Sequence, residues 1–156
     1  MAIVSAICNS FKVEILTATH NFTNSTGNTF KLALYSSDSA TLSKSTTAYT
    51  APSDGTADPT NTYEVTSTSS GYTTGGNSLT STTPALSGDT ACCLFASTSW
   101  GSTASFTARG CLIYNSNASN KAVCVVNFGA DKTVTTGTFT VEFPAQTAGN
   151  AIIQIA

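Results

Sequence analysis

Short apolar segments separated by turn residues run through most of this chain, and they constrain its fold more than any other feature. The segments are rich in β-branched and aromatic residues, and "NSNASN", "FGADKT", "TTGG" and "PAQTAGN", which lie between them, are typical of turns. The expected strands are 29–35, 62–65, 77–80, 91–96, 104–108, 109–114, 121–128, 137–143 and 151–155. Strands at this spacing predict a mainly β chain that folds as one β-sandwich or jelly-roll-like domain over residues 1–156.

Residues 10–20 are the exception to the strand pattern. "FKVEI" alternates apolar and polar residues as a strand does, yet Phe11, Ile15 and Thr19 recur at a spacing of four, as on one face of a helix. Ser10 is a suitable residue to cap such a helix, and Glu14 lies near its positive end. We expect one short N-terminal helix over 10–20.

Two polar intervals, 36–61 and 66–90, are much longer than ordinary connections between strands. They carry almost no charge but contain Tyr49 and Tyr72, and Tyr63 lies between them, so we expect them to be ordered against another surface. The stretch "TYEVTSTSSGYTTGG" is interpreted as a strand that leads into a contact loop, with its glycines at tight turns. Its glycines lack the lysine or the following helix that a phosphate-binding loop requires.

The composition explains how the surface of such a chain stays hydrated. Only 9% of the residues are charged, whereas 50 of the 156 residues are Ser or Thr, so hydroxyl groups supply most of the polar surface. These groups are cheaper to desolvate than lysine, which also loses rotamer freedom when it is fixed. The surface is therefore suited to burial against copies of itself or another protein.

The charge and the hydropathy exclude two classes of partner. The formal net charge is −2 and the six basic residues are scattered, so the basic patch that nucleic-acid binding requires is not expected. No apolar run approaches the ~20 residues of a membrane-spanning helix, and "MAIVSAICNSF" does not resemble a secretory signal. We expect a soluble protein that is made in a cytoplasm.

The five cysteines are expected to be reduced core residues. They are odd in number, form no C-x-x-C pair, and three of them lie within apolar strand segments. Cys92 and Cys93 are adjacent, so in a strand they face opposite sides and cannot pair with each other. With a single histidine, His20, the chain lacks a zinc-ligand pattern, and no metal or other cofactor is expected.

No catalytic set emerges from the sequence. There is no G-x-S-x-G elbow to accompany His20, which we expect to cap the helix end or to pack beneath the following loop. The eight carboxylates occur singly, and most occupy turn positions. Two single residues remain: Trp100 is expected to be a plug between the sheets, and Arg109 requires a carboxylate or carbonyl partner, inside the chain or across a subunit contact.

Several blocks in order resemble a family of small structural proteins of tailed bacteriophages. These blocks are "NFTNSTGNTFKLALYSS", "YEVTSTSSGYTTGGNSLT", "FTARGCLIYN", "KAVCVVNFGADKT" and "GTFTVEFPA", followed by "NAIIQIA". The resemblance covers nearly the whole chain, and it implies a particle protein without catalytic residues that is made in the bacterial cytoplasm and incorporated into the virion.

Three functions remain open from the sequence. The first is a non-enzymatic decoration or cement protein that oligomerises and packs on the major capsid protein, with Tyr49 and Tyr72 in its contact loops. The second is a tail, neck or fibre component that joins tail parts or holds a host glycan through Tyr72 or Trp100. The third is a small hydrolase, for which the sequence supplies no convincing acid, base and nucleophile.

Overall fold

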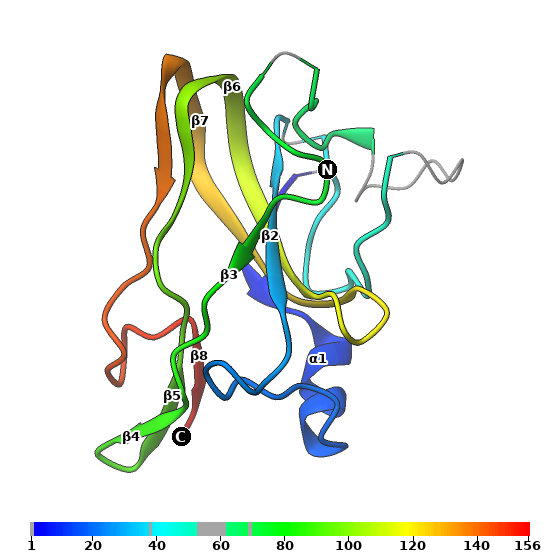
Figure 1. Cartoon of the computed structure of the whole chain (residues 1–156). Coiled ribbons are helices and arrows are strands. Elements are labelled where there is room, and N and C mark those ends of the chain that lie inside the picture. Colours follow the sequence, from blue (N-terminus) through cyan, green and yellow to red (C-terminus); the bar gives the residue numbers. More distant parts are fainter. Residues whose placement is uncertain (1, 38, 53–61, 69) are drawn as a thin grey trace.

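A computed structural model describes residues 2–37, 39–52, 62–68 and 70–156 of the chain. It is mainly β, with two antiparallel sheets and one short helix near the N-terminus (Figure 1), which confirms the fold class predicted from the segment pattern. The elements in chain order are β1 (Ala6–Ile7), α1 (Asn9–Leu16), β2 (Phe30–Tyr35), β3 (Asn77–Leu79), β4 (Ala85–Ser87), β5 (Thr90–Cys93), β6 (Thr98–Asn115), β7 (Lys121–Val141) and β8 (Ile153–Ile155).

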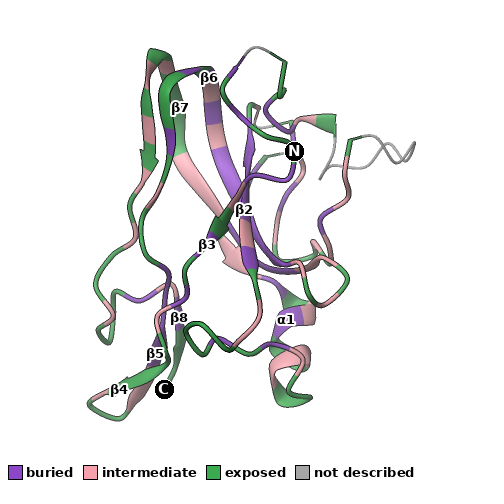
Figure 2. Cartoon of the chain, viewed as in Figure 1, coloured by how far each residue is buried: buried purple, intermediate pink, exposed green. Residues whose placement is uncertain are grey.

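The larger sheet has the strand order β1-β7-β6-β2-β3 and the smaller one the order β4-β5-β8. Strand β2 pairs with β6 from Phe30 opposite Asn115 to Tyr35 opposite Gly110. The central part of this sheet is buried, whereas the ends of the strands and most of the turns are exposed (Figure 2). This burial explains why "CLIY" and "AVCVV" are apolar on both faces.

Strands β6 and β7 form a long ribbon that bends back on itself (Figure 1). Trp100 and Phe106 lie six residues apart on β6, a separation of about 20 Å in an extended strand, yet their ring centroids are 6.2 Å apart. The register shifts at this place, because Trp100 pairs with Phe139 while Ala104 pairs with Gly137. Extra residues on one strand bend it. The irregularity between Trp100 and Ala104 therefore lets the ribbon bend so that the rings of Trp100 and Phe106 meet.

The "FGADKT" segment is a bulge and not the turn that we expected. Ala108 pairs with Lys132, but Gly110 pairs with Asn127, so β7 holds several more residues than β6 over this stretch. Gly129 has a φ of 77°, a conformation that suits glycine in a turn and in a bulge alike. The predicted strands 104–108 and 109–114 are therefore parts of one continuous strand, β6. The predicted strands 121–128 and 137–143 are likewise parts of one strand, β7.

Other elements differ from the expectation at their ends. The helix ends at Leu16 and not near residue 20, because Ala18 has a φ of 56° and cannot continue it. Ser10 is not its cap; Cys8 occupies that position and makes no side-chain capping bond. The predicted strand 62–65 is reduced to a bridge between Tyr35 and Glu64.

The first polar interval packs along the sheet instead of projecting from it. The backbone N–H of Val4 donates to the carbonyl of Leu42, that of Asn9 donates to Lys44, and Ala48 forms a bridge with Lys121. Residues 53–61 of this interval lie outside the described part of the chain. Within the second interval, 66–90, the structure contains β3 and β4.

All five cysteines are buried and unpaired, as predicted. Burial raises the pKa of Cys8 to about 11 and the pKa values of Cys93 and Cys111 to about 12, so these thiols are protonated at neutral pH. No helix in the described ranges is both long enough and apolar enough to cross a membrane.

Candidate functional site

A buried carboxylate organises the loop in which we expected contact residues. Glu64 is 6% exposed, and its side chain accepts hydrogen bonds from three donors. The hydroxyl of Tyr49 donates to Oε2 at 2.9 Å, while the hydroxyl of Tyr72 and the backbone N–H of Gly75 donate to Oε1 at 2.7 and 2.6 Å. Glu64, Tyr72 and Gly75 are thus tied to the interior of their own chain.

The two tyrosines are held further by their neighbours. The backbone N–H of Leu34 donates to the Tyr72 hydroxyl at 3.1 Å, and the Tyr49 ring stacks on Tyr114 with centroids 4.4 Å apart. The Tyr114 hydroxyl in turn donates to the carbonyl of Gly75 at 2.8 Å. These bonds join β2, β6 and the turn at Gly75 into one buried network.

The structure corrects the expectation that these rings face a neighbouring chain. Tyr49 is 6% exposed and Tyr72 is 3% exposed, so neither ring is available at the surface. Tyr63 is half-buried against the core, and its carbonyl accepts a hydrogen bond from the backbone N–H of Ser36. Tyr49 and Tyr72 stabilise the fold, because both donate a hydrogen bond to the buried carboxylate of Glu64. No sequence pattern had indicated that Glu64 is buried.

Burial also raises the pKa values of the ionisable groups in this network. The pKa of Glu64 is raised because desolvation penalises its ionised form, and this effect outweighs the hydrogen bonds that lower the pKa. The pKa of Tyr72 is raised by its own burial and by the adjacent carboxylate. The three groups that donate hydrogen bonds to Glu64, from Tyr49, Tyr72 and Gly75, are all neutral.

Trp100 and Arg109 are also engaged within the chain. Trp100 is 3% exposed and lies between Tyr72, at a centroid distance of 5.9 Å, and Phe139, at 6.0 Å. The guanidinium of Arg109 lies 3.7 Å from a carboxylate oxygen of Asp131 on β7. Its carboxylate partner is therefore inside the chain, the first of the two alternatives that the sequence left open.

His20 lies at the centre of a second polar group. Its Nε2 is 2.9 Å from Glu14 Oε2, and its Nδ1 is 3.0 Å from the amide nitrogen of Asn115. Lys121 donates to the other oxygen of Glu14 at 2.7 Å, and these contacts hold the pKa of Glu14 below its ordinary value despite partial burial. The ring packs against Phe11 and lies after the helix end, close to where the sequence placed it.

This arrangement assigns the proton of the imidazole. The Asn115 oxygen accepts a hydrogen bond from the backbone N–H of Asn117, so its amide nitrogen must face His20, and Nδ1 is then an acceptor while Nε2 carries the hydrogen. Both ring nitrogens are occupied. A general base requires a free nitrogen within reach of a hydroxyl, so the ring as placed supports packing and not proton transfer.

An apolar face on the small sheet is the surface feature that sequence reasoning missed. Leu86 on β4, Ala91 on β5 and Ile155 on β8 are directly paired, so they form one row on one face of the sheet. Leu86 is 74% exposed and Ile155 is 58% exposed. We call this row, Leu86, Ala91 and Ile155, the apolar row.

A groove of about 210 Å³ continues from the apolar row towards the helix. Its walls include Ala91 and Ile155 of the row, Ile153 on β8, and Ile15 on α1. Leu16, the next residue of α1, is 85% exposed. The row could be found only from the register of β4, β5 and β8, because β8 lies about 60 residues after β5 in the sequence.

No protein-family model, curated protein or solved structure matches this chain. Within the described ranges, no three His, Cys, Asp or Glu side chains are placed to hold a metal ion together. The function must therefore be inferred from the residues and the geometry of this chain.

Proposed function

We propose that this chain is a non-enzymatic structural protein of a tailed-bacteriophage virion, and that it decorates the head and cements its subunits. Its partners are copies of itself and the major capsid protein. Its action is cohesive: it bridges neighbouring subunits and stabilises the shell by contact alone. The apolar row on the small sheet is the observation that carries this proposal.

The apolar row gives the contact an energy source. Leu86 and Ile155 are large side chains that remain mostly in water, and covering each of them contributes about 1–2 kcal/mol. Such a contact is weak for one subunit, but a shell repeats it over many copies. Large apolar side chains that are exposed together often mark interaction surfaces.

The surrounding surface permits such a contact at little cost. The chain has only 14 charged residues, six basic and eight acidic, and residues 80–83, which precede β4, all carry hydroxyls. Protein interfaces are depleted of charged residues at their core, because burying an unpaired charge is costly. A tail, neck or fibre location is the alternative, since the same face could join tail components.

The first experiment tests particle membership and location. Virions assembled with the full-length chain are purified on a density gradient, and the chain is quantified against the major capsid protein by gel densitometry. Hundreds of copies per particle support the head location, and about a dozen or fewer support the tail. Its absence from purified particles refutes the proposal.

The second experiment tests the apolar row. Leu86→Glu places a charge in the apolar row. Val13→Glu is the matched control, because Val13 on α1 is 63% exposed but lies outside the row. We expect Leu86→Glu to lower incorporation into particles at least tenfold and the control to leave it unchanged. Equal incorporation of both variants contradicts the assignment of the contact face, while thermal melting checks that both are folded.

A further inference from the structure

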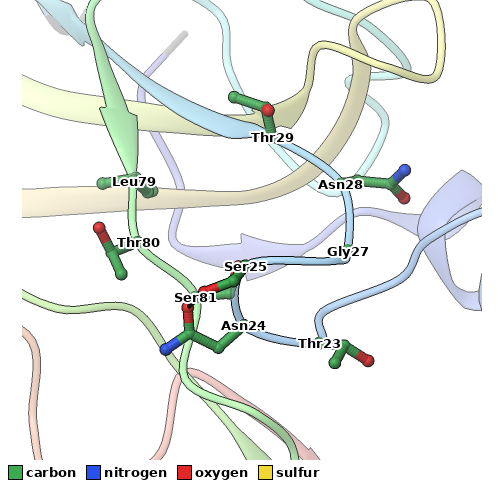
Figure 3. A pocket seen from close by; sticks show the side chains of 9 residues that line it. All are labelled: Thr23, Asn24, Ser25, Gly27, Asn28, Thr29, Leu79, Thr80 and Ser81. Atoms are coloured by element: carbon green, nitrogen blue, oxygen red, sulfur yellow. Dashed lines mark hydrogen bonds between the residues drawn. The ribbon is translucent and has the colours of Figure 1, made fainter.

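A polar cavity lies where the loop that enters β2 faces the chain that leaves β3. Its volume is about 290 Å³, close to the lower end of the range for small-molecule sites, ~300 Å³. Figure 3 shows the nine residues that line it, which come from 23–29 on one side and 79–81 on the other. Apart from Gly27 and Leu79, every lining residue carries a hydroxyl or an amide, and none carries a charge.

The wall formed by the loop is fixed by its own hydrogen bonds. The backbone N–H of Asn21 donates to Asn28 Oδ1 at 2.8 Å, and the backbone N–H of Gly27 donates to the carbonyl of Thr23 at 2.9 Å. A Cβ at Gly27 would overlap the carbonyl oxygens of Asn21 and Thr23, so the close approach requires glycine. A cavity whose wall is already ordered loses little entropy when a ligand binds.

Several polar groups of the lining remain uncommitted. In Asn28 and Asn24 the side-chain oxygen already accepts a hydrogen bond, from Asn21 and from Ser25 respectively, whereas the amide NH₂ groups make none within the described residues. The same is true of the Thr23 and Thr80 hydroxyls. The cavity therefore offers amide donors together with hydroxyls that both donate and accept.

Ser81 adds an independent observation. It is 6% exposed, and its Oγ is buried and has no hydrogen-bond partner among the described residues. A buried hydroxyl without a partner is costly, and Ser81 belongs to the cavity wall. A change of χ1 rotamer turns a serine hydroxyl by about 120°, so a ligand hydroxyl in the cavity could supply the missing partner.

We propose that this cavity binds one ring of a neutral sugar. Each sugar hydroxyl donates and accepts, as the lining hydroxyls do, and the amide NH₂ groups supply further donors for its oxygens. An ionised ligand would lose its hydration without meeting an opposite charge, and an apolar ligand would leave the lining hydroxyls and amides unpaired. The methyl groups of the lining threonines and the edge of Leu79, which is 7% exposed, offer aliphatic surface for the C–H face of the ring.

The sugar site differs from the glycan contact expected at Tyr72 and Trp100. Both of those rings are buried, whereas Thr23, Asn24 and Thr80 at the cavity are exposed. The inference does not depend on virion membership. Sugar binding can fail while the chain is found in particles, and it can succeed in a chain that is not a particle protein.

A titration of the isolated full-length chain tests the inference. The ¹H–¹⁵N spectrum is followed while methyl glycosides of glucose, galactose, mannose, rhamnose and N-acetylglucosamine are added separately, with methyl glucuronide as a charged probe. We expect at least one neutral glycoside to shift the amide signals of residues 23–29 and 79–81 saturably, with a Kd of ~1–10 mM. The charged probe should bind more weakly than the neutral glycoside of the same configuration.

Two variants and one control separate binding from folding. Thr80→Val and Ser81→Ala each remove a lining hydroxyl and should weaken binding about two- to tenfold. Thr138→Val, on an exposed position of β7 far along the chain, should leave the Kd unchanged. Thermal melting shows whether each variant is folded. If one of the two lining variants does not fold, the Kd of the other tests the inference.

Three outcomes overturn the inference. One is the absence of saturable shifts with every neutral glycoside, and another is a set of shifts that maps outside the two lining segments. The third is an unchanged Kd in the folded lining variants.

Discussion

Stability should fall as pH rises from about 4.5 towards neutrality, and the buried carboxylate of Glu64 is the cause. Its pKa in the folded chain is raised above the ordinary value of 4.5, so in the interval between the two values the folded state holds a proton that the unfolded state has released. The free energy of unfolding then decreases with pH. Below 4.5 both states are protonated and the effect is absent.

The size of the effect follows from one proton. A single group can change the free energy of unfolding by at most about 1.4 kcal/mol per pH unit, and only between its unfolded and folded pKa values. Glu64→Gln removes the titration. Because tyrosine hydroxyls can accept as well as donate, the Tyr49 hydroxyl can turn to accept from the new amide group, so the variant should remain folded.

The assay is urea-induced unfolding at half-unit steps from pH 4.5 to 8, followed by the fluorescence of the buried Trp100, the only tryptophan in the chain. Subtracting the curve of Glu64→Gln from that of the wild type isolates the Glu64 contribution, because the other groups are unchanged. Glu142→Gln, which neutralises an exposed carboxylate, is the matched control and should keep the wild-type slope. A wild-type curve parallel to that of Glu64→Gln over the whole range refutes the reasoning.

Three further predictions test the fold and its polar groups. Gly76→Ala should lower the free energy of unfolding by about 3 kcal/mol or more, because φ is +71° and the new Cβ would overlap the carbonyl of Leu32. Gly88→Ala, where φ is +63° but no atom lies close, should lower it by about 1 kcal/mol. Urea-induced unfolding measures both values. The imidazole of His20 should show the Nε2–H form in ¹⁵N NMR spectra at pH 7, and an Nδ1–H form would contradict the placement of its partners. The five thiols should react with a disulfide reagent in urea but not within minutes in the native chain, because they are buried, and rapid native labelling would show that the sheet opens readily.

The strands were predictable where a local pattern determines them. Segments such as 32–35 and 111–114 are apolar on both faces because they lie in the centre of the larger sheet. The continuity of β7 was not predictable, since Gly129 and its neighbours favour a bulge as much as a turn, and only pairing with β6 selects the bulge. Glu64 could not be recognised as buried either, because its donors come from Tyr49, Tyr72 and Gly75, which tertiary structure alone brings together.

Five of the 14 charged residues of this chain are paired or buried within it. Glu14 pairs with Lys121, Arg109 lies beside Asp131, and Glu64 is buried, and only 9% of all residues are charged. Contacts made by such a surface should depend on apolar burial and hydroxyl hydrogen bonds and not on ion pairs.

Association through the apolar row should therefore resist salt. Raising NaCl from about 0.05 to 0.5 M shortens the screening length severalfold and weakens contacts between exposed ions, but it should not release the chain from particles or from its own copies. Ammonium sulfate should strengthen the association, since excluded salts favour apolar burial. Light scattering of the purified chain and sedimentation of particles measure both effects, and release by moderate NaCl would mean that ion pairs, and not the apolar row, hold the contact.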